Sequence, residues 1–200
     1  MSTLTATQEQ QIAAWLAAHP TLTAGVGTAE AACSVAAINL GLTGTLTDSI
    51  PPCMSRVVGR WIIVVQDRMP SDIRNSVEWR ALLPLAAGTG RGHESEHLAV
   101  VLSWMWDTLA LLQPLADRRG FGAEWRRMVF ARTTESARAA YADAAAYADA
   151  AAYAAAYAYA AADAYAAASA AFWRDADPVG CLRRLVAVTD ARAMAGGPQP

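Results

Sequence analysis

The sequence predicts an all-α protein, an irregular bundle of about six or seven helices with a long Ala/Tyr-rich helix near its C-terminus. Three observations predict this class. Apolar residues recur at helical spacing, Pro and Gly fall where helices would end, and no convincing strand pattern occurs. We expect a core domain over residues 1–130, the long helix over 131–176, a short helix over 177–192 and a disordered tail over 193–200.

The expected helices of the first half lie between breaks at Pro, Gly or polar loops. Their approximate ranges are 7–18, 29–40, 53–69 and 72–83. Gly41 stands where a glycine would end the second helix. The run Ile62–Val65 alone could pass for a strand, but the longer apolar period around it favours a helix. Pro84 is expected to bend or break the fourth helix.

The helix expected from His93 to Leu112 has apolar residues on two sides, which predicts a central place in the bundle. Pro114 and a turn at residues 118–120 then separate it from a helix that opens near Gly122 and packs back on the core.

The segment from Ala139 to Ala171 uses only Ala, Tyr, Asp and Ser. Alanine has the highest helix propensity, so this low-complexity segment predicts a helix about 50 Å long. It holds all the tyrosines of the chain, namely Tyr141, Tyr147, Tyr153, Tyr157, Tyr159 and Tyr165. Their spacing points them in several directions, so they form no single stripe. We consider two interpretations: an interaction rod for a protein partner or a homo-oligomer, or a tolerated codon-repeat expansion that only covers the core.

His93-Glu94-Ser95-Glu96-His97 matches the H-E-x-x-H pattern of zinc metalloproteases. In that pattern two histidines one turn apart bind zinc, and the intervening glutamate acts as general base. The motif therefore predicts His93 and His97 as metal ligands and Glu94 as the catalytic base, should the protein be an enzyme. Glycines directly before His93 place it at a helix start, and a third ligand would have to be Glu124 or Glu135. An exposed polar helix start is the alternative.

The loop Gly88–Gly92 runs directly into this helix. Backbone N–H groups at Gly90 and Gly92, with the Arg91 guanidinium, could hold a phosphate or nucleotide. The loop lacks the lysine of a P-loop and no strand precedes it, so an ordinary connection between helices is the competing interpretation.

Charge and cysteine content bound the remaining functions. The net charge of −2 argues against nucleic-acid binding, and the three cysteines are too widely spaced for a C-x-x-C metal or redox pair. No signal-peptide pattern and no membrane-spanning apolar run is found, which predicts a cytoplasmic protein that does not enter a membrane.

The stretch Gly59-Arg60-Trp61-Ile62-Ile63, with Gln66–Pro70 and Leu82–Thr89, resembles proteins carried by phages and prophages of GC-rich bacteria, some with similar Ala-rich tails. The resemblance implies a phage or mobile-element origin and transfers no activity or functional residue.

These observations rank three functions. We expect first a non-enzymatic interaction protein, without cofactor, that self-associates or binds a protein through its Ala/Tyr helix. A zinc-dependent hydrolase with the His-Glu-Ser-Glu-His motif comes second, and a binder of a small anion at Gly90–Gly92 third.

Overall fold

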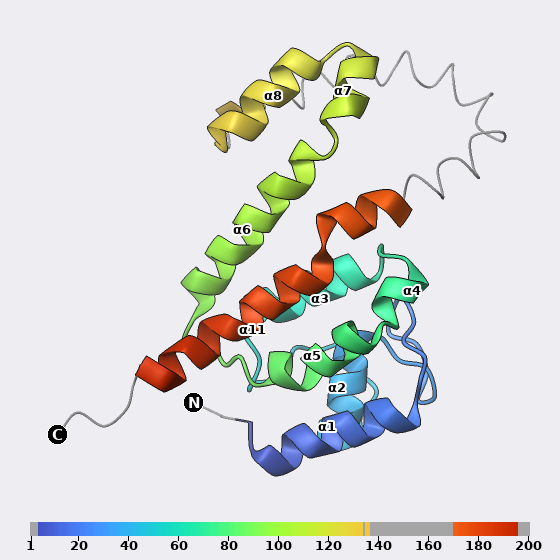
Figure 1. The fold of residues 1–200 in the computed structure, drawn as a ribbon. Coiled ribbons are helices and arrows are strands. Elements are labelled where there is room, and N and C mark those ends of the chain that lie inside the picture. Colours follow the sequence, from blue (N-terminus) through green and yellow to red (C-terminus); the bar gives the residue numbers. More distant parts are fainter. Residues whose placement is uncertain (1–3, 134, 137–169, 196–200) are drawn as a thin grey trace. The chain divides into compact units, whose positions relative to one another are not determined.

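The computed structural model describes residues 4–133, 135–136 and 170–195, with side chains to 189 in the last range (Figure 1). Its helices there are α1 (Ala6–Ala18), α2 (Ser34–Thr43), α3 (Arg56–Gln66), α4 (Ser71–Arg74), α5 (Val77–Ala87), α6 (Glu94–Ala110), α7 (Gln113–Arg119), α8 (Gly122–Ala131) and α11 (Pro178–Ala195). Within these residues the structure has no strand, only an isolated bridge between Gly27 and Ala32. The predicted all-α class is confirmed. The long helix expected over 131–176 lies mostly outside the described residues.

The chain forms two compact units. Unit 1 comprises Met1–Val101 and Asp177–Pro200, and unit 2 comprises Leu102–Ala176. Helix α6 begins in unit 1 and continues into unit 2, and α11 returns to unit 1. The boundary we expected at residue 130 falls inside unit 2. None of the described helices is both long and apolar enough to cross a membrane.

Helix α2 forms the centre of unit 1. Every residue from Ser34 to Asn39 is buried, and α1, α3 and α5 all pack against this helix. Helix α11 packs against α5 and α3 and buries Cys181, Leu182 and Leu185 completely. The central place expected for the helix at 93–112 is wrong, because α6 buries only His97. The small side chains of α2 let three neighbours approach it closely, which a helix rich in Leu and Trp does not allow.

The second helix starts and ends later than the sequence suggests. It begins at Ser34, capped by Cys33, and runs through Gly41 to Thr43, where Gly44 adopts the left-handed conformation. A Cβ atom at Gly41 would lie 2.6 Å from the Cα atom of Ile12. The glycine that we took for a helix end is therefore the contact point of α2 with α1.

Other helix ends also differ from expectation. The fourth predicted helix is two helices, because the Ser76 hydroxyl accepts from the Trp79 N–H at 3.1 Å and starts α5 anew. Pro84 lies inside α5 without ending it. Helix α7, which we did not predict, has Pro in its first turn, where a missing N–H costs no hydrogen bond. Helix α11 starts at Pro178, inside the range of the short helix expected over 177–192, and continues to Ala195.

Candidate functional site

The His-Glu-Ser-Glu-His motif forms the first turn of α6, as the sequence suggests. The His97 N–H donates to the His93 carbonyl at 2.9 Å, and the two imidazole rings stand nearly perpendicular with their centroids 6.3 Å apart. The spacing thus places both histidines on one side of the helix start. His97 is completely buried and His93 is partly exposed.

Glu94, the candidate catalytic base, caps the N-terminus of α3. Its carboxylate accepts hydrogen bonds from the Ser55 hydroxyl at 2.7 Å, the Arg56 N–H at 2.9 Å and the Val57 N–H at 3.1 Å. The two backbone N–H groups are donors that a helix N-terminus leaves without intrahelical partners, and the helix dipole favours a negative charge there.

This arrangement fixes the charge of Glu94. Partial burial acts to raise the pKa of Glu94, but the hydrogen bonds from Ser55 and the backbone of Arg56 and Val57 outweigh it, so the pKa lies below the ordinary 4.5. A carboxylate held in this way is a weak base, and both of its oxygens are directed at α3. The geometry favours a structural role for Glu94 over general-base catalysis.

The imidazole of His97 is buried and poorly hydrogen-bonded. Burial lowers the pKa of His97, and the Glu94 carboxylate opposes this shift. The Leu185 backbone faces the ring and also favours its protonated form, but neither ring nitrogen makes a contact with hydrogen-bond geometry within the described residues. Nδ1 of His93 likewise lacks a hydrogen bond and lies 3.9 Å from an oxygen of Glu96.

A complete metal-ligand set does not form in the part of the chain that the structure describes. No group of three His, Cys, Asp or Glu side chains there could hold a metal ion. Glu124, one of the two expected third ligands, pairs with Arg127 at 2.7 Å. Glu135, the other, is exposed in unit 2.

The expected anion loop is occupied by contacts with its own chain. The Gly90 N–H donates to the Cys53 carbonyl at 2.8 Å, and the Arg91 guanidinium donates to the carbonyls of Pro51 and Pro52, both at 3.4 Å. The Thr89 hydroxyl accepts from the Ser55 N–H at 3.1 Å. The loop therefore holds the segment before α3, and Gly92 is exposed beside it. Because the Gly90 N–H and the Arg91 guanidinium already donate to carbonyls of the chain, the structure does not favour a phosphate site in this loop.

All three cysteines are free and buried. Burial raises the pKa values of the Cys33 and Cys53 thiols, and it raises the pKa of Cys181 to about 12. Because the thiolate is the reactive form, none of these side chains is a candidate nucleophile.

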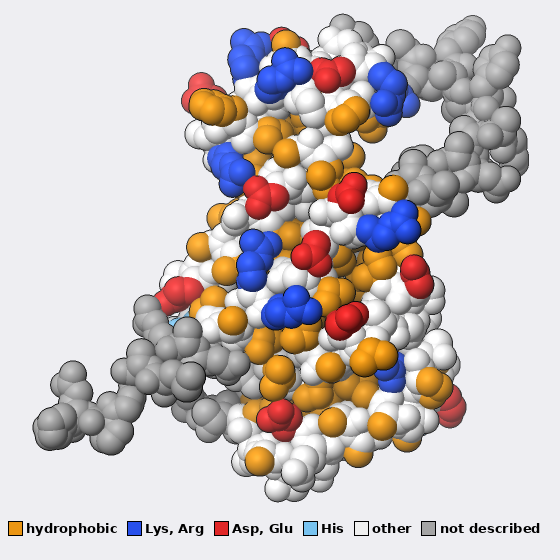
Figure 2. Space-filling view, in the orientation of Figure 1, with side chains coloured by type: hydrophobic (Ala, Val, Ile, Leu, Met, Phe, Trp, Pro, Cys, Tyr) orange, Lys and Arg blue, Asp and Glu red, His pale blue; other side chains and the backbone are white. Residues whose placement is uncertain are grey.

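Two surfaces have exposed apolar side chains. A groove of about 700 Å³ lies between α1 and α5 in unit 1, beside Val77, which is 82% exposed. In unit 2, Phe130 near the end of α8 is 91% exposed. Figure 2 shows arginine, acidic and hydrophobic side chains interleaved over α7 and α8. Neither surface was predicted from the sequence, although the spacing of Phe130 from Arg126 and Arg127 is visible in it.

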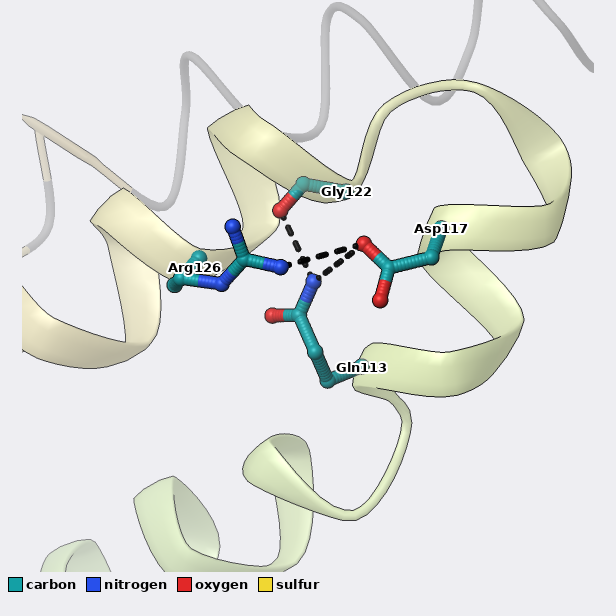
Figure 3. Close-up of polar contacts among 4 residues, drawn as sticks. All are labelled: Gln113, Asp117, Gly122 and Arg126. Atoms are coloured by element: carbon teal, nitrogen blue, oxygen red, sulfur yellow. Dashed lines mark hydrogen bonds and ion pairs between the residues drawn. The ribbon is translucent and has the colours of Figure 1, made fainter.

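A polar cluster fixes α8 beside α7 (Figure 3). The Gln113 amide donates to the Asp117 carboxylate at 2.8 Å and to the Gly122 carbonyl at 2.9 Å, and Arg126 lies 3.3 Å from the same carboxylate. A Cβ atom at Gly122 would lie 1.8 Å from an oxygen of Asp117, so the close turn requires glycine. Helix α8, which bears the exposed Phe130, is therefore fixed against α7 by these contacts.

No protein-family model matches this chain, and comparisons with curated proteins and with solved structures find no match either.

The six tyrosines, the remaining candidate interaction residues, lie outside the described residues. The structure describes the chain on both sides of them. Residues 170–176 are helical, and the Trp104 indole N–H donates to the Ala176 carbonyl at 2.6 Å. On the other side the chain passes from α8 through Arg132 and Thr133.

Proposed function

We propose that the protein is a non-enzymatic helical interaction protein that binds a second copy of itself, or another protein, through residues 139–171. The observation that carries this proposal is a helix start just before that segment. The Thr133 hydroxyl accepts from the Ser136 N–H at 3.2 Å, and the Ser136 hydroxyl accepts from the Thr133 N–H at 3.3 Å. This reciprocal pair is a capping box, the arrangement that begins helices.

The composition of the segment supports the same proposal. Alanine lets a second helix approach closely, and tyrosine provides a large, stiff contact area with a polar tip. On a helix, Asp143 would lie one turn from Tyr147, and Asp149 one turn from Tyr153. We place this function in the cytoplasm and, from the resemblance of residues 59–89, in a protein of phage or mobile-element origin.

Replacement of all six tyrosines by alanine tests the proposal. This variant keeps the helix propensity of the segment and removes its large side chains. Deletion after Arg138 is unsuitable, because it would also remove α11 from the core of unit 1. The matched control replaces the same six residues by phenylalanine, which keeps the contact area. We expect the wild-type and phenylalanine chains to sediment above the monomer mass and the alanine variant to sediment as a monomer.

A wild-type chain that stays monomeric would restrict the proposal to a heterologous partner, to be sought by affinity capture with the alanine variant as control. Equal capture by both chains would contradict the role of the tyrosines.

Zinc-dependent hydrolysis is the second candidate function. It is favoured by one observation: three buried ring nitrogens, both of His97 and Nδ1 of His93, have no hydrogen bond within the described residues. Zinc bound by His93 and His97 would satisfy two of them. A catalytic role for Glu94 would further require its carboxylate to leave α3.

Metal content distinguishes the two candidates. The tag-free protein, purified without chelator, is compared with its His93→Ala variant by mass spectrometry of bound metals. We expect no stoichiometric zinc in either. Stoichiometric zinc that disappears in the variant would overturn our leading proposal and make hydrolase assays the next step.

A further inference from the structure

The outer face of α8 has the residue pattern of a helix-docking surface. Ala123, Arg126, Arg127 and Phe130, which we call the α8 stripe, recur at i, i+3, i+4 and i+7 and line one shallow depression. The opposite face packs inward, since Met128 is buried and the Trp125 indole N–H donates to the Leu109 carbonyl at 2.9 Å. Helix α8 is therefore packed on its inner face, and its exposed face combines the apolar side chains of Ala123 and Phe130 with two arginines.

The α8 stripe itself carries basic charge. Helices α7 and α8 together contain four arginines against one aspartate and one glutamate. The side chains of Arg126 and Arg127 are 66% and 75% exposed, and each makes one ion pair with a carboxylate of α7 or α8. Such exposed pairs are weak, and a guanidinium has further N–H donors to offer another carboxylate.

These charges also limit what can bind there. Two α8 stripes from different copies would bring like-charged arginines together, which is unfavourable. The stripe instead fits an apolar segment whose own charged residues are acidic.

We infer that the α8 stripe is the docking surface for residues 139–171 of this protein, an inference that rests on the proposed interaction function of that segment. Its only charged residues are Asp143, Asp149 and Asp163, and it contains no basic residue. Its aromatic side chains are all tyrosines, which can pack on Phe130 while aspartates one helical turn away pair with Arg126 and Arg127.

The course of the chain supports this occupant. Only Arg132 and Thr133 lie between the end of α8 and the capped turn that leads into the segment. Arg132 adopts the left-handed conformation with φ of 53°, and its N–H donates to the Met128 carbonyl to close α8. Because only eight residues separate Phe130 from the start of the segment at residue 139, the local concentration of the segment at the stripe is high.

Photocrosslinking in the full chain tests the inference. The photoreactive residue p-benzoylphenylalanine replaces Phe130, and in a control chain it replaces Val77, which is 82% exposed in unit 1. Trypsin releases the segment within one peptide, residues 139–174, because no Lys or Arg lies between Arg138 and Arg174. We expect position 130 to crosslink to this peptide and position 77 not to do so.

A charge variant makes the test specific. Combined Arg126→Glu and Arg127→Glu substitutions in the position-130 chain should reduce the crosslink yield at least several-fold, and so should Asp143→Asn, Asp149→Asn and Asp163→Asn together. A crosslinked product of monomer mass shows docking within one chain, and a product of dimer mass shows docking on a second copy; both support the inference.

Absence of the 139–174 peptide from the position-130 crosslinks, or an equal yield from position 77, would overturn the inference. The proposed function has its own readout in the sedimentation of the six-tyrosine variant. If the crosslink is missing but the six-tyrosine variant still loses its association, the proposed function is supported and only the docking on the α8 stripe is excluded.

Discussion

The two units use their charged side chains in opposite ways. In unit 1 three of them lie at helix ends: Glu94 at the N-terminus of α3, Arg74 at the carbonyl end of α3, and Arg80 at the carbonyl end of α1. In unit 2 the arginines of α8 and its C-cap point outward and form single pairs with exposed or half-buried carboxylates.

The difference separates residues that stabilise the fold from residues that are free for a partner. A charge buried at a helix end satisfies backbone groups that would otherwise lack partners, so its removal is costly. The charges of an exposed ion pair are hydrated in both the folded and the unfolded chain, so the pair contributes little to stability. We therefore expect substitutions in unit 1 to change stability and those on the α8 stripe to change binding.

Arg74→Met should produce the largest loss of stability. The Arg74 guanidinium is buried and donates to the carbonyls of Gln66 at 2.6 Å, Leu22 at 3.3 Å and Met69 at 3.4 Å. Methionine fills much of the volume but leaves these carbonyls without their donor, so we expect a loss of about 3 kcal/mol. Denaturant unfolding measures it, with the exposed Arg68→Met as control. Equal midpoints for both variants would contradict the capping role.

Glu94→Gln should destabilise the protein by about 2 kcal/mol, because charge-assisted hydrogen bonds at a helix N-terminus are lost. Denaturant unfolding measures this loss. The matched control is Glu78→Gln, because Glu78 is exposed in the first turn of α5. A neutral effect of Glu94→Gln would mean that the carboxylate is not held at α3, and it would revive Glu94 as a candidate base.

His97 should make the protein sensitive to mild acid. Its pKa is lower in the folded chain than the ordinary 6.5, so the unfolded chain binds the proton more readily and stability falls as the pH drops below 6.5. The free energy of unfolding then changes by at most about 1.4 kcal/mol per pH unit. The contribution of Glu94 is lost only at lower pH, below 4.5. His97→Met should therefore flatten the unfolding free energy between pH 6.5 and 5. If the unfolding free energy of this variant still falls between pH 6.5 and 5, the acid sensitivity arises from a group other than His97.

The sequence was a good guide to helix content and a poorer guide to the use of polar residues. The apolar period predicted α1, α3, α6 and α8, because helices with one packed face leave that pattern. The same pattern wrongly predicted a central place for α6, whereas α2 forms the centre of unit 1. Helix α2 is short and rich in alanine, so its burial depends on the close contact at Gly41, which no local pattern reveals.

The candidate site shows the same limit. The i, i+4 spacing correctly brought His93 and His97 together, since it depends only on helix geometry. The partners of Glu94 at Ser55, Arg56 and Val57 are about forty positions earlier in the chain, a distance over which a motif contains no information. A short catalytic motif and a helix cap use the same residue types, and only tertiary contacts distinguish them.

Substitution of Arg126 and Arg127 by alanine should give the smallest effect on stability. Both ion pairs are exposed at the arginine, and α8 is also held by Met128, Trp125 and the contacts of Gln113. We expect the free energy of unfolding to change by less than about 0.5 kcal/mol per pair. If the double variant unfolds as the wild type does but loses its association, the arginines of unit 2 serve a partner. A stability loss as large as that of Arg74→Met would instead show that both units use their charges to hold the fold, and the contrast between them would fail.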